Sequence, residues 1–160
     1  MLLSKQSASS DRKYRLYASK FAMLATFLCI FSQSTFASTL NTVSEINQAL
    51  MKGKDINLSI DLTQCFDREN NIKGTMRGGM KITSYLIRPD GSLAFSDMHQ
   101  TVNNKDKPQV QFLRYRSKDE NTIGFSMRTF TLPDWKPYGN PAQYECAINK
   151  GIVFYSHDQD

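Results

Sequence analysis

The spacing of apolar residues divides the chain into three stretches with different patterns. An unbroken apolar run, residues 21–31, follows a polar and positively charged N-terminus. Between residues 42 and 53 the apolar residues recur at helical spacing, and from residue 55 onward they alternate with polar ones, which is typical of half-buried strands. The pattern therefore predicts a separate N-terminal segment, followed by one helix and a β-rich domain.

The first 37 residues have the three parts of a secretory signal peptide. A basic region precedes the apolar run, and Thr35-Phe36-Ala37 supplies the small-x-small residues of a cleavage site before Ser38. The eleven-residue run makes a helix of about 16 Å, too short for a hydrocarbon core of about 30 Å. We therefore expect cleavage between Ala37 and Ser38, a periplasmic or secreted location, and no membrane span in residues 38–160.

The excess positive charge belongs to this leader. The full chain has 20 basic and 15 acidic residues, and six of them lie in the leader: Lys5, Asp11, Arg12, Lys13, Arg15 and Lys20. Residues 38–160 therefore hold 15 basic and 14 acidic side chains, a formal net charge of +1. Such a domain lacks the electrostatic attraction on which nucleic-acid binding depends, so we expect no nucleic-acid partner.

Two cysteines, Cys65 and Cys146, remain when Cys29 leaves with the leader. In an oxidising compartment they pair most simply with each other, and closing so long a loop stabilises a fold by roughly 4–5 kcal/mol in the chain-entropy treatment. We predict this disulfide; the alternative is two unpaired buried thiols.

One helix and about seven strands are expected in residues 38–160. A capping box, Thr42-Val43-Ser44-Glu45, begins the helix and Lys52-Gly53 ends it. Residues 66–79 and 132–141 are predicted loops, because the first is polar and glycine-rich and the second holds three prolines. The predicted strands are 55–62, 80–88, 92–102, 109–117, 122–131, 143–148 and 152–156.

Turn residues connect these strands as antiparallel neighbours. Arg88-Pro89-Asp90-Gly91, Lys118-Asp119-Glu120-Asn121 and Asn149-Lys150-Gly151 each join two successive strands. We therefore predict an α+β, mainly antiparallel domain, built as a single curved sheet or small barrel with the helix covering one face or end.

One group of polar side chains has the composition of a binding or catalytic site. Asp97 and His99 share a face of strand 92–102, about 7 Å apart, and the neighbouring predicted strand carries Arg114 and Arg116. A carboxylate, an imidazole and a guanidinium can orient a proton-transfer histidine or bind an anion. The sequence places no serine or cysteine nucleophile within reach of these side chains, so it does not support a catalytic triad. The alternative is structural: a cross-strand ion pair beside a hydrogen-bonded histidine explains the same residues.

The remaining motifs give no reason to expect a metal or cofactor. Arg77-Gly78-Gly79 lacks the spacing of a phosphate-binding loop, and the isolated cysteines and distant histidines form no zinc pattern. Trp135 is a candidate partner contact, because it lies in the proline-rich stretch where an exposed aromatic side chain is available for binding.

Four segments carry a resemblance to a known family: GKDINLSIDLTQC (53–65), RGGMKITSYLIRPDGSLAFSDMHQTV (77–102), KPQVQFLRYR (107–116) and CAINKGIVFY (146–155). Together they resemble the VirK family of small exported bacterial proteins, named from a virulence regulon. The resemblance covers nearly all of residues 38–160 and includes both cysteines. It implies a virulence-associated, exported protein, and it brings no enzymatic activity or catalytic residue with it.

Two functions follow as expectations. The first is a non-enzymatic accessory protein that binds a protein or an envelope component. The second is a small β-barrel ligand-binding protein or hydrolase that uses Asp97, His99 and Arg114. A deep pocket lined by those three side chains favours the second; a filled interior with an exposed apolar or aromatic patch favours the first.

Overall fold

The computed structural model of the 160-residue chain describes residues 37–67 and 73–157. The proposed leader, up to residue 36, lies outside the described residues; Ala37 and Ser38 are exposed. The elements are β1 (Ser38–Leu40), α2 (Val43–Met51), β2 (Asp55–Asp61), the 3-10 turn η2 (Leu62–Gln64), β3 (Arg77–Lys81), β4 (Tyr85–Ile87), β5 (Leu93–Val102), β6 (Pro108–Asp119), β7 (Thr122–Thr131), β8 (Lys136–Ala147) and β9 (Ile152–His157).

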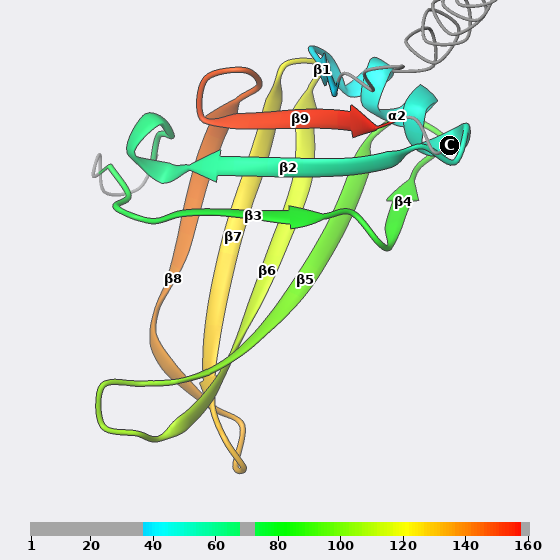
Figure 1. The fold of residues 1–160 in the computed structure, drawn as a ribbon. Helices are drawn as coiled ribbons and strands as arrows, with labels where there is room; N and C mark the ends of the chain where they lie inside the picture. Colours follow the sequence, from blue (N-terminus) through cyan, green and yellow to red (C-terminus); the bar gives the residue numbers. More distant parts are fainter. Residues whose placement is uncertain (1–36, 68–72, 158–160) are drawn as a thin grey trace, which may run out of the picture. The chain divides into compact units, whose positions relative to one another are not determined.

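Two antiparallel sheets form the domain, so the prediction of a single sheet or barrel is wrong. One sheet has four strands in the order β1-β9-β2-β3, and the other has five in the order β4-β5-β6-β7-β8. The four-stranded sheet crosses one end of the longer sheet at a steep angle (Figure 1). The mainly antiparallel α+β class is confirmed.

Helix α2 begins and ends as its sequence predicts. The Thr42 hydroxyl accepts a hydrogen bond from the Glu45 backbone N–H at 3.1 Å, and Gly53 adopts the left-handed φ of 75° that follows a helix end. Apolar residues of one face are buried, and the Val43 N–H donates to the Glu120 carbonyl in the β6–β7 turn at 2.9 Å. The helix therefore covers the end of the five-stranded sheet at which this turn lies.

The alternation of apolar residues predicted where most strands lie, but not which strands pair with each other. The predicted strand 80–88 is two strands in different sheets, because β3 pairs with β2 and β4 pairs with β5. β3 also takes in residues 77–79, which were predicted to be loop. Polar residues Thr83 and Ser84 interrupt the alternation where the chain passes between the sheets.

The proline-rich stretch, residues 132–141, was predicted to be loop, yet six of its ten residues lie in β8. β8 is an edge strand, so a proline without an N–H group can face the open side without breaking the ladder. The register with β7 jumps from Met127–Ala142 to Thr129–Tyr138, leaving a bulge that contains Gly139 at a φ of 69°. An edge position and a bulge together accommodate Pro137 and Pro141.

The last two strands do not form the predicted hairpin. β8 belongs to the five-stranded sheet, whereas β9 lies between β1 and β2 in the other. The turn at residues 149–151 is present, with Gly151 N–H donating to the Ala147 carbonyl at 2.9 Å, but it carries the chain across from one sheet to the other.

Cys65 and Cys146 lie at disulfide distance and connect the two sheets. Their Sγ atoms are 2.01 Å apart and their Cα atoms 4.5 Å apart. Cys65 follows η2 at the end of β2, and Cys146 is on β8, so the bond fixes the crossing of the sheets near its edge.

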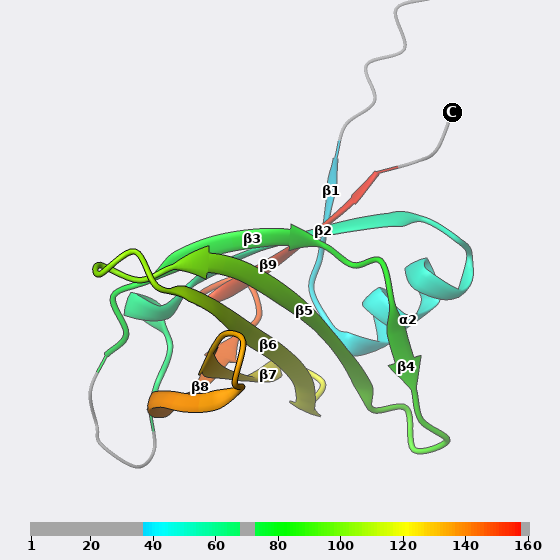
Figure 2. The same cartoon turned by 90° about the horizontal axis from the view of Figure 1, so that it is seen from below.

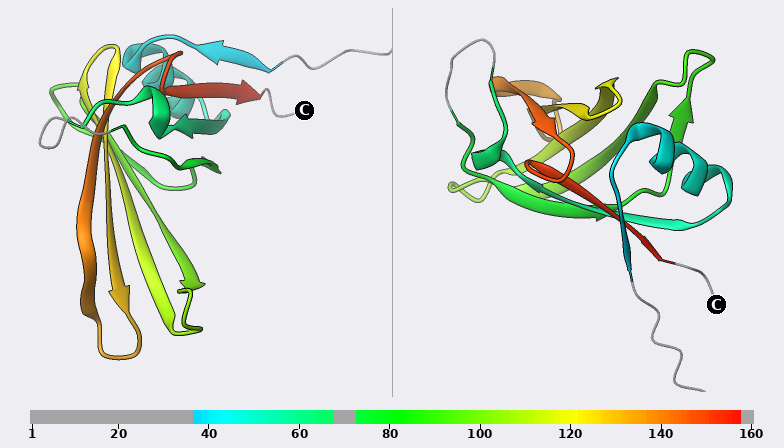
Figure 3. Two further views of the ribbon diagram at one scale, coloured as in Figure 1. Left: turned by 90° about the vertical axis from the view of Figure 1, so that its left-hand side faces the viewer. Right: turned by 90° about the horizontal axis from the view of Figure 1, so that it is seen from above.

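The five-stranded sheet is covered on its inner face over half of its length. We call the row Asp97–Leu113–Met127–Ala142 and everything beyond it toward residues 102 and 108 the distal half, and the remainder the proximal half. The strands of the distal half extend past the four-stranded sheet (Figures 1 and 3). Six apolar side chains of the proximal half are buried in the common core, Leu93, Phe95, Tyr115, Ile123, Phe125 and Cys146, whereas Val110 is the one buried apolar side chain of the distal half.

Candidate functional site

The predicted cluster of Asp97, His99 and Arg114 is divided between the two faces of the sheet. Asp97 lies opposite Leu113 and His99 opposite Gln111, whereas Arg114 lies opposite Ser96. Directly opposite residues of antiparallel strands share a face, so Asp97 and His99 point to the inner side and Arg114 to the outer side. The three groups cannot act together. A register shifted by one residue would have joined them, and sequence alone did not specify that register.

On the inner side, Asp97 and His99 line a cleft of about 480 Å³ between β3 and the start of the distal half. Its walls are mainly apolar, and the lining residues include Met76, Met80, Leu113 and Met127. The His99 Nδ1 atom lies 3.3 Å from the Gln111 Oε1 atom. Asp97 accepts a hydrogen bond from the Met98 backbone N–H at 2.8 Å. The cleft is therefore an apolar space with a polar margin.

Tyr115 lies at the bottom of this region and is 3% exposed. Burial, and secondly the nearby Asp97 carboxylate, raise the pKa of the Tyr115 phenol to about 12. The ring stacks on Phe95 with centroids 4.7 Å apart. Tyr115 thus stays neutral at ordinary pH and acts as part of the core.

The described residues that line the cleft include no serine, threonine or cysteine, and Asp97 is their one carboxylate. Nor does any group of three or more His, Cys, Asp and Glu that could hold a metal ion occur within residues 37–67 and 73–157. The geometry offers binding contacts, and His99 has an amide rather than a carboxylate beside it.

Strand β3 forms one wall of the cleft, and among the described strands one of its backbone edges has no partner. Leu62 N–H donates to the Met76 carbonyl and Ile82 N–H to the Ile56 carbonyl, so the alternate residue Gly79 directs its backbone groups away from β2. At Gly78, whose partner Ile60 faces the core, an added Cβ would meet nothing within 4 Å. Seen from below, β3 lies at the margin of its sheet above the curved long sheet (Figure 2).

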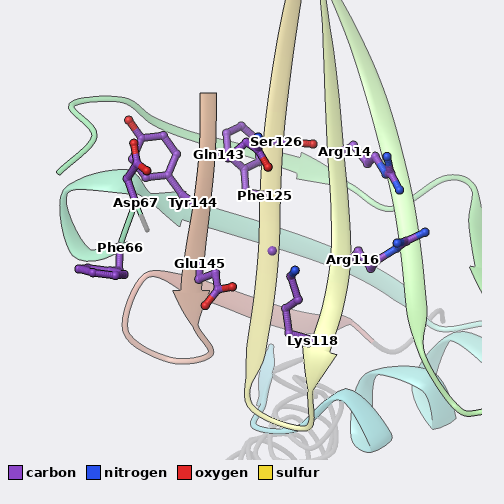
Figure 4. A pocket seen from close by; sticks show the side chains of 11 residues that line it. Phe66, Asp67, Arg114, Arg116, Lys118, Phe125, Ser126, Gln143, Tyr144 and Glu145 are labelled. Carbon is purple, nitrogen blue, oxygen red and sulfur yellow. The ribbon is translucent and has the colours of Figure 1, made fainter. Parts of the chain in front are cut away.

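The outer face carries a second hollow region, which we call the outer groove. Two adjoining hollows of about 380 and 460 Å³ share Arg114, Ser126 and Gln143. The first also contains Arg116 and Lys118, and the second contains Arg128. Figure 4 shows Arg114 and Arg116 on one side of the first hollow, with Asp67 and Glu145 across β7 on the other.

The four cations of the outer groove make no ion pair among the described residues. The ion pairs within 4 Å among the described residues are Arg77–Asp61, Lys81–Asp55 and Lys136–Asp134, and none of them includes a cation of the groove. Arg116 lies two strands from Glu145, with Gly124 between them, a separation of about 10 Å across the sheet. The Arg116 Nε atom is buried and has no hydrogen-bond partner. A buried donor of this kind calls for a ligand or a water molecule.

Trp135 lies apart from Asp97 and His99, beside the aromatic end of the outer groove. Its ring centroid is 6.2 Å from that of Phe112, which is 5.8 Å from that of Phe130. The side chain is 53% exposed, as expected for a candidate contact, and its backbone has a φ of 53°.

Sequence reasoning missed Lys118 and the continuity of the groove. The signal was available, since Arg114, Arg116 and Lys118 are spaced two apart on one strand and therefore share a face. The edge of β3 was not predicted, because the polar, glycine-rich residues 66–79 indicated a loop.

Comparison with known proteins identifies the family. The sequence profile described as "VirK protein" matches residues 39–135. This chain belongs to the VirK family. An "Uncharacterized protein in pinF2 3'region" of Rhizobium radiobacter is 41% identical over 117 residues, which cover 72% of this chain and 81% of that protein. An "Uncharacterized protein y4wH" of Sinorhizobium fredii is 36% identical over 118 residues, covering 73% and 81%.

A solved VirK-family structure has the same fold. The crystal structure of lpg1832, a VirK family protein from Legionella pneumophila, superposes with a TM-score of 0.62 and covers 72% of this chain and 97% of that one. At a sequence identity of 18%, this similarity concerns the fold alone. In the part of this VirK chain that the structure describes, no helix is both long and apolar enough to cross a membrane.

Proposed function

We propose that residues 38–160 form an exported, virulence-associated accessory protein that binds an extended segment of a partner protein in the inner cleft. The single observation that carries this proposal is the edge of β3, which no described strand covers, beside an open, largely apolar space. An extended peptide can add to such an edge through backbone hydrogen bonds and place alternate side chains in the space beside it.

The residues of the cleft fit a peptide better than a small polar substrate. Methionines line much of the cleft, among them Met76, Met80 and Met127, and their flexible side chains adapt to different apolar partners. Asp97, His99 and Gln111 at the margin supply hydrogen bonds that fix the register of the segment. Asp97 and His99 thereby keep the binding role for which they were candidates, without Arg114.

The binding test uses a library of extended nonapeptides displayed against the disulfide-intact domain. We expect enrichment of peptides with apolar residues at alternate positions. Gly78→Leu should weaken their binding at least tenfold, because the leucine side chain enters the open space at Gly78. The matched control, Ser126→Leu, adds the same side chain on the outer face and should leave binding unchanged. Enrichment that is indifferent to Gly78→Leu, or no enrichment, contradicts the proposal.

Export is tested separately by the mass of the protein recovered from the producing bacterium. Cleavage between Ala37 and Ser38 predicts a chain that begins at Ser38 in the periplasm or the medium. A full-length chain retained in the cytoplasm would contradict export.

A further inference from the structure

We propose that the outer groove is a second binding site, which takes a linear acidic polysaccharide. This inference is independent of the peptide proposed for the inner cleft. The two sites lie on opposite faces of the sheet and have no charged side chain in common. It rests on the row of cations, on the small residues beside them and on the aromatic side chains at the end of the groove.

The cations form a row that matches a chain of negative charges. Arg114, Arg116 and Lys118 alternate along β6, so their attachment points lie about 7 Å apart on one face. Arg128 adds a fourth positive charge from β7. The lining residues of the two hollows hold these four cations against Asp67 and Glu145, an excess of positive charge in a domain that is otherwise nearly neutral. Guanidinium groups bind carboxylates through two parallel hydrogen bonds.

The cations are available because small residues lie between them and the acids. The row across the sheet at Arg114 is Ser96, Arg114, Ser126 and Gln143, and the row at Arg116 has Ala94 and Gly124 as neighbours. A Cβ at Gly124 would lie 2.9 Å from the Lys118 Cε atom, so the absence of a side chain there gives the lysine its place. The Arg116 Nε atom has no partner within the described protein, which a ligand oxygen would supply.

A sugar polymer accounts for the rest of the groove. Ser126 and Gln143 provide a hydroxyl and an amide at the point where the two hollows join, and such groups hydrogen-bond to sugar hydroxyls. Beyond them Phe112 and Trp135 present aromatic rings that are 39% and 53% exposed. Aromatic faces bind the apolar faces of sugar rings by contact. From Arg116 to Phe112 the strand spans about 14 Å, room for roughly three sugar rings.

Other polyanions fit less well. A nucleic acid depends on a broad positive field, which a formal charge of +1 over residues 38–160 does not provide. An acidic peptide would satisfy the cations, but it would leave the exposed rings of Phe112 and Trp135 without a matching partner.

The test measures binding of a hexamer of (1→4)-linked galacturonate to residues 38–160 by calorimetry. We expect binding that weakens with added salt, while neutral maltohexaose does not bind. Arg114→Gln and Arg116→Gln should each weaken binding of the uronate by about tenfold, and Arg116→Lys by less, because a lysine keeps the charge and loses the paired hydrogen bonds. Lys105→Gln removes the same charge from an exposed loop and should have no effect.

A second comparison separates a polysaccharide site from a merely cationic one. Phe112→Ala should weaken uronate binding about fivefold, with the thermal unfolding midpoint of every variant measured as a control for folding. Hexaglutamate and a six-residue oligothymidylate should bind at least tenfold more weakly than the uronate. Equal binding of either competitor, equal loss with Lys105→Gln, or no binding of the uronate would overturn the proposal.

Discussion

The proximal and distal halves of the long sheet are built from the same strands and differ in what covers them. The proximal half lies under the four-stranded sheet, and its inner side chains Leu93, Phe95 and Ile123 are at most 5% exposed. The distal half continues the same ladders, but its inner side chains Asp97 and His99 are exposed and Leu113 is half-buried. Backbone pairing therefore extends the sheet beyond the second sheet, while most of the buried side chains lie where the second sheet crosses it.

This difference assigns most of the stability to the inner face of the proximal half. The core contributes most of the hydrophobic free energy, because that energy follows apolar area removed from water. Exposed apolar side chains at the distal half contribute little to folding and are available to a partner. The inner cleft lies at the boundary between the halves. The outer groove has Arg114, Arg116 and Lys118 on the outer face of the proximal half and its aromatic end in the distal half. The predictions below test that division.

The largest effect should come from truncating a buried ring. Phe154→Ala should reduce the free energy of unfolding by about 3–5 kcal/mol, because Phe154 is fully buried between the sheets. Phe112→Ala in the distal half should reduce it by less than about 1 kcal/mol, since that ring is 39% exposed. Urea unfolding of both variants measures the contrast, and similar losses would show that the distal half is part of the stabilising core.

The next effect concerns the bond between the sheets. Replacing both cysteines, Cys65→Ala with Cys146→Ala, should lower the free energy of unfolding by about 2–5 kcal/mol, because the bond joins residues 81 positions apart. Gly151→Ala places a Cβ 2.7 Å from the Cys65 Sγ atom and should cost about 1–3 kcal/mol. That cost should shrink in the cysteine-free background. An unchanged cost in the double-mutant cycle would mean that Gly151 acts on the turn and not on the bond.

Alkaline unfolding should report on Tyr115 in the proximal half. The pKa of its phenol is raised from 10.0 to about 12, so the folded state keeps a proton that the unfolded state loses. The stabilisation is complete below pH 10 and is lost as the pH rises toward 12, by roughly 2–3 kcal/mol at 1.36 kcal/mol per unit. Tyr115→Phe should remove this portion of the pH dependence. Identical alkaline curves for the two proteins would contradict the burial of the phenol.

The smallest effect is expected at the tip of the distal half. Trp135→Gly should change the free energy of unfolding by less than about 1 kcal/mol, because the exposed ring loses few contacts and glycine adopts the φ of 53° without strain. Circular dichroism during urea unfolding measures this. A loss of several kcal/mol would make Trp135 a structural residue and would weaken its role beside the outer groove.

The sequence by itself determined the local elements, because each depends on neighbours along the chain. The Thr42 capping box and Gly53 placed the helix, and apolar alternation located β2, β5, β6 and β7. The spacing of Arg114, Arg116 and Lys118 already places three cations on one face. The family resemblance, now confirmed, also came from sequence segments alone.

Only the tertiary structure decided which strands are partners and which side chains meet. Alternation assigns residues to one face or the other but does not specify register, so Asp97 met Leu113 and not Arg114. A proline excludes a central strand but not an edge strand, and edge position is a property of the whole sheet. The short strand β3 carries glycines and two cations, and it became a strand because β2 offered a partner edge. The sites exist where the two sheets cross and where the longer one continues alone, which depends on contacts between distant parts of the chain.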